Sequence, residues 1–159
     1  MKSLIKNYLL LALAFLFIQS CAGTKDLAPD GSEIPLNVNL IIAHIDSDQE
    51  SAFQNVGQFL IQKGYSIESS SPEFYTLRTN FREATAGSLD AWANISISAS
   101  VISINGNTQI NFTGTLNSAL NDNEPIKQYG QSGSVMRVAW DEFYKTVKSY
   151  SDNLTFEIR

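Results

Sequence analysis

The stretch NISISASVISINGNTQINFTGTLN, residues 94–117, alternates apolar and polar residues on both sides of Asn105-Gly106. An Asn-Gly pair between alternating runs is a strong hairpin signal, because both central residues of a type I′ turn need a positive φ. If Ile104 and Asn107 flank the turn, each position in one run has a defined partner in the other. This register places apolar residues or glycine opposite one another in four pairs: Val101 with Ile110, Ala99 with Phe112, Ile97 with Gly114 and Ile95 with Leu116. The sequence therefore predicts a long hairpin with one buried face and one face of Ser, Thr and Asn, since a one-residue slip would exchange the faces.

A helix is predicted on the N-terminal side of this hairpin. Ser47 is its expected N-cap, Glu50 completes a capping box three residues later, and Gly64 is expected to end the helix. Gly57 costs about 1 kcal/mol relative to alanine in a helix interior, so we expect this helix to approach the sheet closely. A second helix is predicted for residues 134–150, where one helical face carries Met136, Ala139, Trp140, Phe143, Val147 and Tyr150.

Shorter alternating runs predict four further strands, at residues 36–45, 65–69, 73–81 and 154–158. Residues 69–72 are expected to form a turn and residues 82–91 a loop. The expected order of elements is β-α-β-β-β-β-α-β. An apolar helix stripe must be buried against another element, so the sequence predicts an α+β fold with a mostly antiparallel sheet and two helices packed on one face.

The N-terminus has the pattern of an export signal. Lys2 and Lys6 precede an eleven-residue apolar segment that runs from Tyr8 to Ile18. Eleven helical residues span about 16 Å, roughly half the apolar core of a bilayer, so we expect this segment to be removed. Cys21, the only cysteine of the chain, follows directly. A buried free thiol is the alternative role for Cys21, but no core is expected at this position.

The run Ile18-Gln19-Ser20-Cys21 resembles the lipobox of bacterial lipoproteins, in which the cysteine is lipidated and becomes the new N-terminus. The resemblance implies that Cys21 carries a lipid anchor and that Ala22 after it directs the protein to the bacterial outer membrane, with the domain in the periplasm. Residues 22–35 contain prolines, glycines and charges without apolar periodicity, which predicts a flexible tether with a reach of about 50 Å. The expected organisation is therefore a signal peptide (1–20), a lipidated cysteine with its tether (21–35) and one domain (36–159).

The charge balance limits the classes of partner. Without Lys2 and Lys6, the chain has 9 basic and 16 acidic residues, a formal net charge of −7. It has no run of Lys and Arg, so nucleic acid is not an expected partner, and adsorption to anionic lipid by charge is not expected either. We therefore expect the lipid at Cys21 to provide the attachment to the membrane.

The chain offers no arrangement typical of a metal site or a catalytic centre. Asp46, Asp48 and Glu50 alternate as in calcium loops, but the glycine and the distal glutamate of an EF-hand loop are missing. Carboxylates in a first helical turn are favoured by the helix dipole, which is the better explanation. His44, the only histidine, lacks partners for a zinc site or a catalytic dyad, so we expect it to form local hydrogen bonds. The sequence predicts no enzyme activity, no metal and no cofactor.

The polar face of the hairpin is the candidate binding surface. One-sided antiparallel sheets often simply face water, but Ser, Thr and Asn also hydrogen-bond adaptably to a partner. The candidate residues are Ser96, Ser98, Asn111 and Thr113 on the strands, with Trp92 and Tyr129 as possible aromatic anchors.

Residues 52–81, AFQNVGQFLIQKGYSIESSSPEFYTLRTNF, resemble the helix-grip domains of lipoprotein component C of the outer-membrane β-barrel assembly machinery. The order of helices and strands is also similar to that of the lipoprotein that plugs the lipopolysaccharide translocon. The shared positions are packing positions, so the resemblance implies a fold and a cell compartment and carries no ligand residues. We expect a non-enzymatic accessory or assembly factor that binds envelope proteins or glycans. The alternative is a lipid or small-molecule carrier with a groove between the second helix and the sheet.

Overall fold

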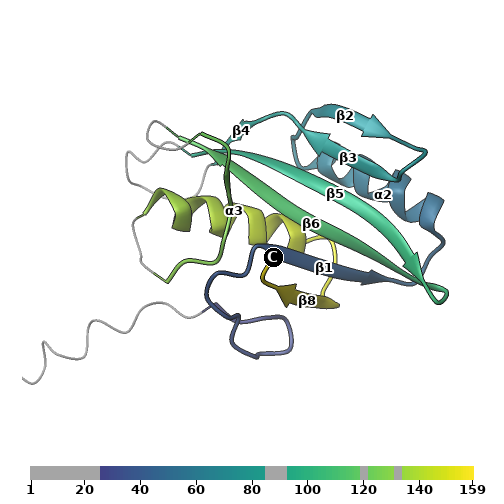
Figure 1. The fold of residues 1–159 in the computed structure, drawn as a ribbon, viewed down its shortest axis with the longest axis horizontal. Helices are drawn as coiled ribbons and strands as arrows, with labels where there is room; N and C mark the ends of the chain where they lie inside the picture. The colour runs from purple at the N-terminus through teal and green to yellow at the C-terminus, as the bar shows by residue number, and fades with distance from the viewer. Residues whose placement is uncertain (1–25, 85–92, 119–121, 131–133) are drawn as a thin grey trace, which may run out of the picture.

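The computed structural model of the protein describes residues 26–84, 93–118, 122–130 and 134–159. Within these ranges, two helices and an eight-stranded antiparallel sheet confirm the predicted α+β class (Figure 1). The helices are α2 (Gln49–Gln62) and α3 (Val135–Lys148). The strands are β1 (Leu40–Ile45), β2 (Ile67–Ser71), β3 (Thr76–Thr79), β4 (Arg82–Glu83), β5 (Asn94–Ile104), β6 (Asn107–Asn117), β7 (Glu124–Pro125) and β8 (Leu154–Glu157).

The sheet is built around the long hairpin of β5 and β6. Its strand order is β2-β3-β5-β6-β1-β8, with β4 paired to β5 and β7 paired to β6. The two short strands β4 and β7 lie in segments predicted as loops, so they add to the expected order of elements without changing its sequence. The first and last long strands, β1 and β8, are antiparallel neighbours, so the C-terminus lies beside the start of the domain.

The predicted hairpin register is confirmed. Ile104 pairs with Asn107, and the predicted apolar pairs lie opposite one another along both strands. Asn105 and Gly106 have φ values of 51° and 82°, as a type I′ turn requires. The same turn chemistry that the dipeptide encodes therefore sets which face of the hairpin is buried.

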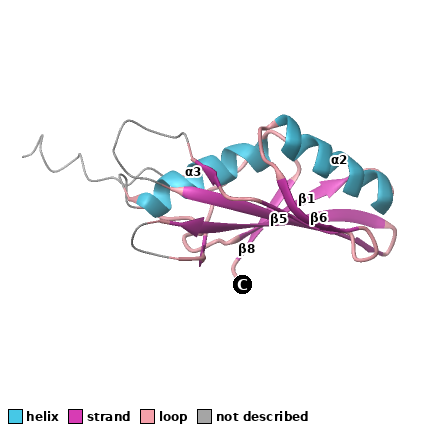
Figure 2. Ribbon diagram, turned by 90° about the horizontal axis from the view of Figure 1, so that it is seen from above, coloured by secondary structure: helices cyan, strands magenta, loops and turns pink. Residues whose placement is uncertain are grey.

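Both helices cover one face of the sheet (Figure 2). Val56 and Leu60 of α2, and Trp140 and Phe143 of α3, are fully buried against the apolar side of the hairpin. Phe112 of β6 is buried at the centre of this layer. The face of Ser, Thr and Asn lies on the opposite side of the sheet, because side chains alternate along each strand.

The N-cap of α2 differs from the predicted one by a residue. The cap is Asp48, whose carboxylate accepts a hydrogen bond from the Ser51 backbone N–H at 2.8 Å, while the Ser47 hydroxyl bonds to the Asp48 carbonyl. The first helical turn favours a charged acceptor, so the aspartate caps the helix in place of the serine. Gly64, with a φ of 85°, follows the end of the helix as predicted.

Three strand boundaries also differ from prediction. β1 begins at Leu40, because Asn37 has a φ of 66° and turns the chain before the strand. β2 extends through Ser71, so the serines predicted as a turn pair with β3 instead. The turn lies later, at Pro72–Tyr75, where Tyr75 has a φ of 50° and its ring packs edge-on against Phe53 of α2.

Gly114 and Gly57 differ in the space that a larger side chain would have. A Cβ at Gly114 would come within 2.8 Å of Ile126 Cδ1 and 3.1 Å of Ile126 Cβ, so β6 needs glycine where the segment after β7 crosses it. A Cβ at Gly57 would lie 3.6 Å from Leu77 Cδ2, which is an ordinary contact. The expected reason for Gly57, close approach of α2 to the sheet, is therefore wrong, since an alanine fits there.

Candidate functional site

A groove of about 370 Å³ lies on the face of the sheet opposite the helices. Strands β2, β3, β5 and β6 form its floor, and the C-terminal residue Arg159 joins it from beyond β8. The lining residues are Ser69, Ser70, Ser71, Thr76, Leu77, Arg78, Ser98, Ala99, Ser100, Asn111, Thr113 and Arg159. Sheet register brings these residues together, because Thr76 lies opposite Ser100 and Arg78 lies opposite Ser98.

Seven hydroxyl groups in this groove have no intramolecular hydrogen-bond partner within the described ranges. They belong to Ser69, Ser70, Ser71, Thr76, Ser98, Ser100 and Thr113. Adjacent strands are about 4.8 Å apart, so these hydroxyls form closely spaced rows across the sheet. Each hydroxyl can donate one hydrogen bond and accept others, so the rows can bind a ligand rich in polar groups.

Arg78 of β3 lines one side of the groove. Its Nε lies 3.3 Å from Glu68 Oε2 and 3.4 Å from Ser96 Oγ. The guanidinium also lies over the Phe81 ring, 5.8 Å from its centroid. The side chain is 41% exposed, and in the described part of the chain its terminal nitrogens have no partner. Arg78 is thus held through Nε while its two terminal nitrogens point to solvent and ligand.

Arg159 is the second cation of the groove, and its backbone is fixed by a distant residue. The Arg159 N–H donates to Asn39 Oδ1 at 2.8 Å, and Asn39 Nδ2 donates to the Arg159 carbonyl at 2.9 Å. The Asn39 N–H in turn bonds to the Glu157 carbonyl at 3.2 Å. This exchange extends the pairing of β8 with β1 and holds Arg159 at the groove.

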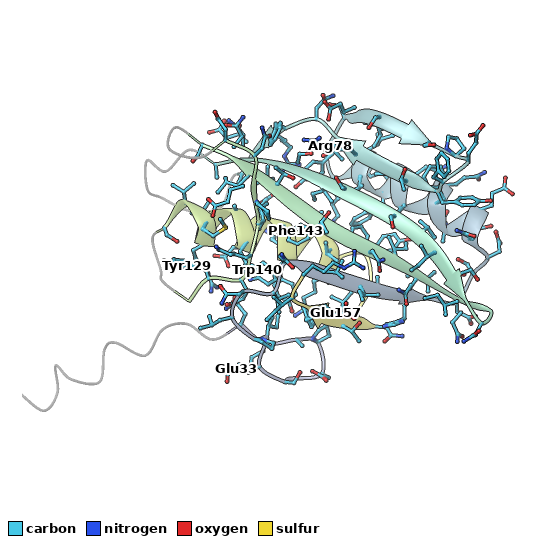
Figure 3. The ribbon with its side chains drawn as sticks, viewed as in Figure 1. Glu33, Arg78, Tyr129, Trp140, Phe143 and Glu157 are labelled. Atoms are coloured by element: carbon cyan, nitrogen blue, oxygen red, sulfur yellow. The ribbon has the colours of Figure 1, made fainter. Side chains whose placement is uncertain are left out.

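The predicted site residues are only partly brought together. Ser98, Asn111 and Thr113 line the groove. Ser96 is 1% exposed and donates to the Thr79 carbonyl at 2.7 Å, so it supports β3 and is not available to a ligand. Tyr129 lies beside α3, away from Arg78, and its carbonyl accepts from Arg137 (Figure 3). Trp92 lies outside the described residues.

Sequence reasoning missed two kinds of groove residue. Ser100 shares the alternation of Ser98, so the strand pattern alone would have included it. Arg78 and Arg159 come from a different hairpin and from the C-terminus, and no local spacing links them to β5. Their position depends on the order of strands in the sheet, which the sequence does not display.

The N-terminal segment predicted as a tether is partly folded onto the domain. Asp26 accepts two hydrogen bonds from Arg137, at 2.6 and 2.9 Å, and one from Trp140 Nε1 at 2.9 Å. Gln128 Nε2 adds a fourth at 3.2 Å. We call this set the Asp26 clamp: Asp26, Gln128, Arg137 and Trp140. Both carboxylate oxygens are occupied, so the chain is fixed to α3 from residue 26 onwards.

Residues after Asp26 continue this docking. Ala28 and Ile34 are buried, and the Leu27 carbonyl accepts from the Tyr144 hydroxyl at 2.7 Å. The Ile34 N–H donates to the Asp26 carbonyl at 2.9 Å, which closes a compact loop. The expected boundary between tether and domain, after residue 35, is therefore wrong. The buried side chains of Ala28 and Ile34 and the carboxylate of Asp26 hold residues 26–35 in place. These residues form no periodic apolar pattern, so the sequence does not reveal the docked segment.

The clamp also has an electrostatic effect on α3. Burial alone would lower the pKa of Arg137, but hydrogen bonds to Asp141 and Asp26 outweigh burial and raise it. The Arg137 side chain is 12% exposed and forms a second ion pair with Asp141 at 2.9 Å. The guanidinium is thus charged at any pH at which the protein is folded.

The other polar clusters have structural roles. His44 Nε2 lies 3.2 Å from Thr155 Oγ1, a local hydrogen bond between β1 and β8. Arg82 donates to the Lys63 carbonyl at the end of α2, pairs with Glu142 of α3 at 2.9 Å and lies over the Tyr65 ring. In the part of the chain that the structure describes, no three His, Cys, Asp or Glu side chains gather closely enough to hold a metal ion.

The space between α3 and the sheet is filled by side chains. Trp140, Phe143 and Val147 belong to the hydrophobic core and are at most 1% exposed. Trp140 and Phe143 also pack edge to face, with ring centroids 6.0 Å apart. This packing gives no support to a carrier groove at that interface. None of the helices in the described ranges has the length and apolar content needed to cross a membrane.

No protein-family model matches the chain. No curated protein matches it in sequence.

Proposed function

We propose that the protein is a lipid-anchored, non-enzymatic protein of the bacterial outer membrane, and that its periplasmic domain binds another envelope component as an accessory or assembly factor. The observation that carries this proposal is the groove on the open sheet face. Within the described ranges, seven hydroxyls without an intramolecular partner and two arginines lie there, on the sheet face that neither α2 nor α3 covers (Figure 2). A sheet that merely faced water would not require Arg159 to be fixed at this surface by Asn39.

The anchor is supported by the N-terminal sequence. Cys21 follows an apolar segment too short to span a bilayer, in a run that resembles a lipobox. Several acyl chains hold a protein at a membrane far more firmly than one, since each buried CH₂ contributes about 0.8 kcal/mol. Mass spectrometry of the N-terminal peptide is expected to find acylated Cys21. A chain that retains Met1 would contradict this part of the proposal.

The binding role is tested by purification from native membranes in mild detergent, followed by identification of what accompanies the protein. Three forms are compared: wild type, Cys21→Ala, and Ser98→Tyr, which fills the groove from the middle of β5. The control is Ser103→Tyr, because Ser103 is exposed on the same strand and alternates to the other face.

The expected result is a companion molecule that is present with wild type and Ser103→Tyr, reduced with Cys21→Ala and lost with Ser98→Tyr. The loss with Ser98→Tyr alone would assign binding to the groove. If Ser98→Tyr and Ser103→Tyr retain the same companions, the groove is not the binding surface.

A further inference from the structure

The charge of the groove is opposite to the charge of the chain. The whole sequence has a formal net charge of −5, yet the groove is lined by the side chains of Arg78 and Arg159 and by no Asp or Glu side chain. The nearest acid described for Arg78 is Glu68, which contacts only Nε and leaves the terminal nitrogens open. Arg159 forms no ion pair within the described ranges. The groove therefore favours a ligand that carries negative charge.

The shape of an arginine narrows the kind of anion. The guanidinium is planar, and its parallel N–H groups match two oxygens of a carboxylate or of a phosphate. Arg78 has this edge free because its Nε is used by Glu68 and Ser96. A carboxylate or phosphate placed against Arg78 or Arg159 would thus receive two hydrogen bonds at once.

The rest of the lining favours a hydroxyl-rich ligand over a protein. Protein interfaces depend on apolar and aromatic anchors, but the apolar lining here consists of Leu77 and Ala99, which are 5% and 2% exposed. Apart from the two arginines, the accessible lining consists of the seven serine and threonine side chains, while Asn111 is 9% exposed. Sugar hydroxyls both donate and accept, as these side chains do, so the two sets can satisfy one another. The volume of about 370 Å³ is in the range of small-ligand sites.

We propose that the groove binds an acidic saccharide, with its carboxylate or phosphate groups paired to Arg78 and Arg159 and its hydroxyls bonded to the serines and threonines of β2, β3, β5 and β6. This inference rests on the proposed function, because it assigns a class of ligand to the same face. It adds the requirement that the ligand carries negative charge, which the proposed function does not make.

The test uses the acylated full chain in mild detergent on an array of uronic-acid, muramic-acid, phosphorylated and neutral oligosaccharides. The tightest acidic binder is then titrated by calorimetry against wild type, Arg78→Gln, Arg159→Gln and Lys145→Gln. Lys145 is exposed on α3, on the opposite side of the sheet, so its variant removes the same charge without touching the groove. Thermal unfolding of each variant confirms that it is folded.

Each groove variant is expected to weaken binding about tenfold, which corresponds to about 1.4 kcal/mol, and Lys145→Gln is expected to leave it unchanged. Reducing the carboxyl groups of the saccharide to alcohols, or removing its phosphate groups, is expected to cause a loss of similar size. Equal binding of acidic and neutral saccharides would overturn the inference. So would arginine variants that bind as wild type does.

Failure of the inference is distinguishable from failure of the proposed function. If no saccharide binds but Ser98→Tyr releases a protein companion from native membranes, the groove binds a protein and the assigned ligand class is wrong. If no saccharide binds and no companion depends on Ser98, both proposals fail.

Discussion

Asp26 shows how one carboxylate can define where a domain begins. It lies in a segment of prolines, glycines and charges, yet it accepts hydrogen bonds from the side chains of Gln128, Arg137 and Trp140. A half-buried carboxylate needs such partners, because an unpaired charge away from water is costly. Arg137 supplies the compensating charge and Trp140 supplies an indole N–H that would otherwise be buried without a partner.

Substitution of Asp26 by Asn is expected to lower the free energy of unfolding by about 1–3 kcal/mol, because Arg137 loses its bidentate partner and retains only the more exposed Asp141. Urea unfolding followed by circular dichroism measures the change. Amide exchange at Ile34, whose N–H bonds to the Asp26 carbonyl, is expected to accelerate.

The control for this prediction is Asp30→Asn, since Asp30 is exposed in the same loop and bonds only to Ser32. It is expected to leave stability unchanged. If both variants unfold at the same urea concentration as wild type, the Asp26 clamp does not stabilise the fold.

Two buried tyrosines make stability dependent on pH in the alkaline range. Burial raises the pKa of Tyr65, and the Glu142 carboxylate raises it further, while the hydrogen bond with Thr146 opposes both. Burial likewise raises the pKa of Tyr150. Free tyrosine ionises near pH 10, so the unfolded chain loses these protons first. The stabilisation from both phenols is therefore complete below about pH 10 and is lost as the pH rises through their folded pKa values.

The free energy of unfolding is expected to fall as the pH rises above about 10, and the fall is expected to be smaller in Tyr65→Phe. Phenylalanine keeps the ring against the Arg82 guanidinium and removes only the titrating group. Denaturant unfolding at a series of pH values tests this. An identical slope in Tyr65→Phe and wild type would show that Tyr65 does not contribute.

At the scale of elements, packing across layers decides which glycines are required. Gly114 on β6 faces Ile126, which is fully buried where the chain leaves β7 and crosses the hairpin. Gly57 on α2 faces the flexible end of Leu77 at ordinary contact distance. The same substitution at the two positions therefore has opposite expected effects.

Gly114→Ala is expected to destabilise the protein by about 1–3 kcal/mol through overpacking, whereas Gly57→Ala is expected to stabilise it by about 1 kcal/mol through helix propensity. Thermal unfolding of both variants provides the comparison. Adding Ile126→Ala to Gly114→Ala is expected to restore part of the loss relative to Ile126→Ala alone. No interaction between the two substitutions in this cycle would contradict the proposed contact.

The elements that could be predicted from the sequence were those fixed by local signals. The Asn105-Gly106 turn and strict alternation were sufficient for the hairpin register, and Ser134 with an apolar stripe was sufficient for α3. The docked segment that starts at Asp26 was missed, because its stability comes from side chains on α3. The strand pattern predicts Ser96 as a surface residue, because alternation does not reveal its hydrogen bonds with Arg78 and the Thr79 carbonyl.

At the scale of the whole molecule, the sheet order unites residues that the chain separates. β8 pairs with β1, and this pairing brings Arg159 beside a groove formed mainly by β3 and β5. The serines and threonines of the candidate site could thus be predicted from the sequence. Arg78 and Arg159 could not, because their positions depend on the order of strands in the sheet.

The Asp26 clamp also determines the distance between the domain and the proposed anchor. Five residue steps from Cys21 to Asp26 reach at most about 18 Å, compared with the roughly 50 Å expected for a tether ending at residue 35. Neutron reflectometry of the acylated protein on a supported bilayer is expected to place the domain directly beside the headgroups. Insertion of eight Gly-Ser residues after Ala22 is expected to move it outward by on the order of 10 Å. A domain layer already far from the headgroups in the wild-type protein would contradict the clamped arrangement.

The short connection between Cys21 and the Asp26 clamp affects how much affinity for its ligand the groove needs. A domain on a long tether samples a large volume, whereas one held within a thin layer meets a ligand fixed in that layer at an effective concentration of order millimolar. A site of exposed hydroxyls and two arginines has few apolar contacts and is suited to modest affinity. Confinement would keep such a site occupied where its ligand is dense and leave it empty elsewhere. The Asp26 clamp would thus make binding depend on location without a higher affinity of the groove.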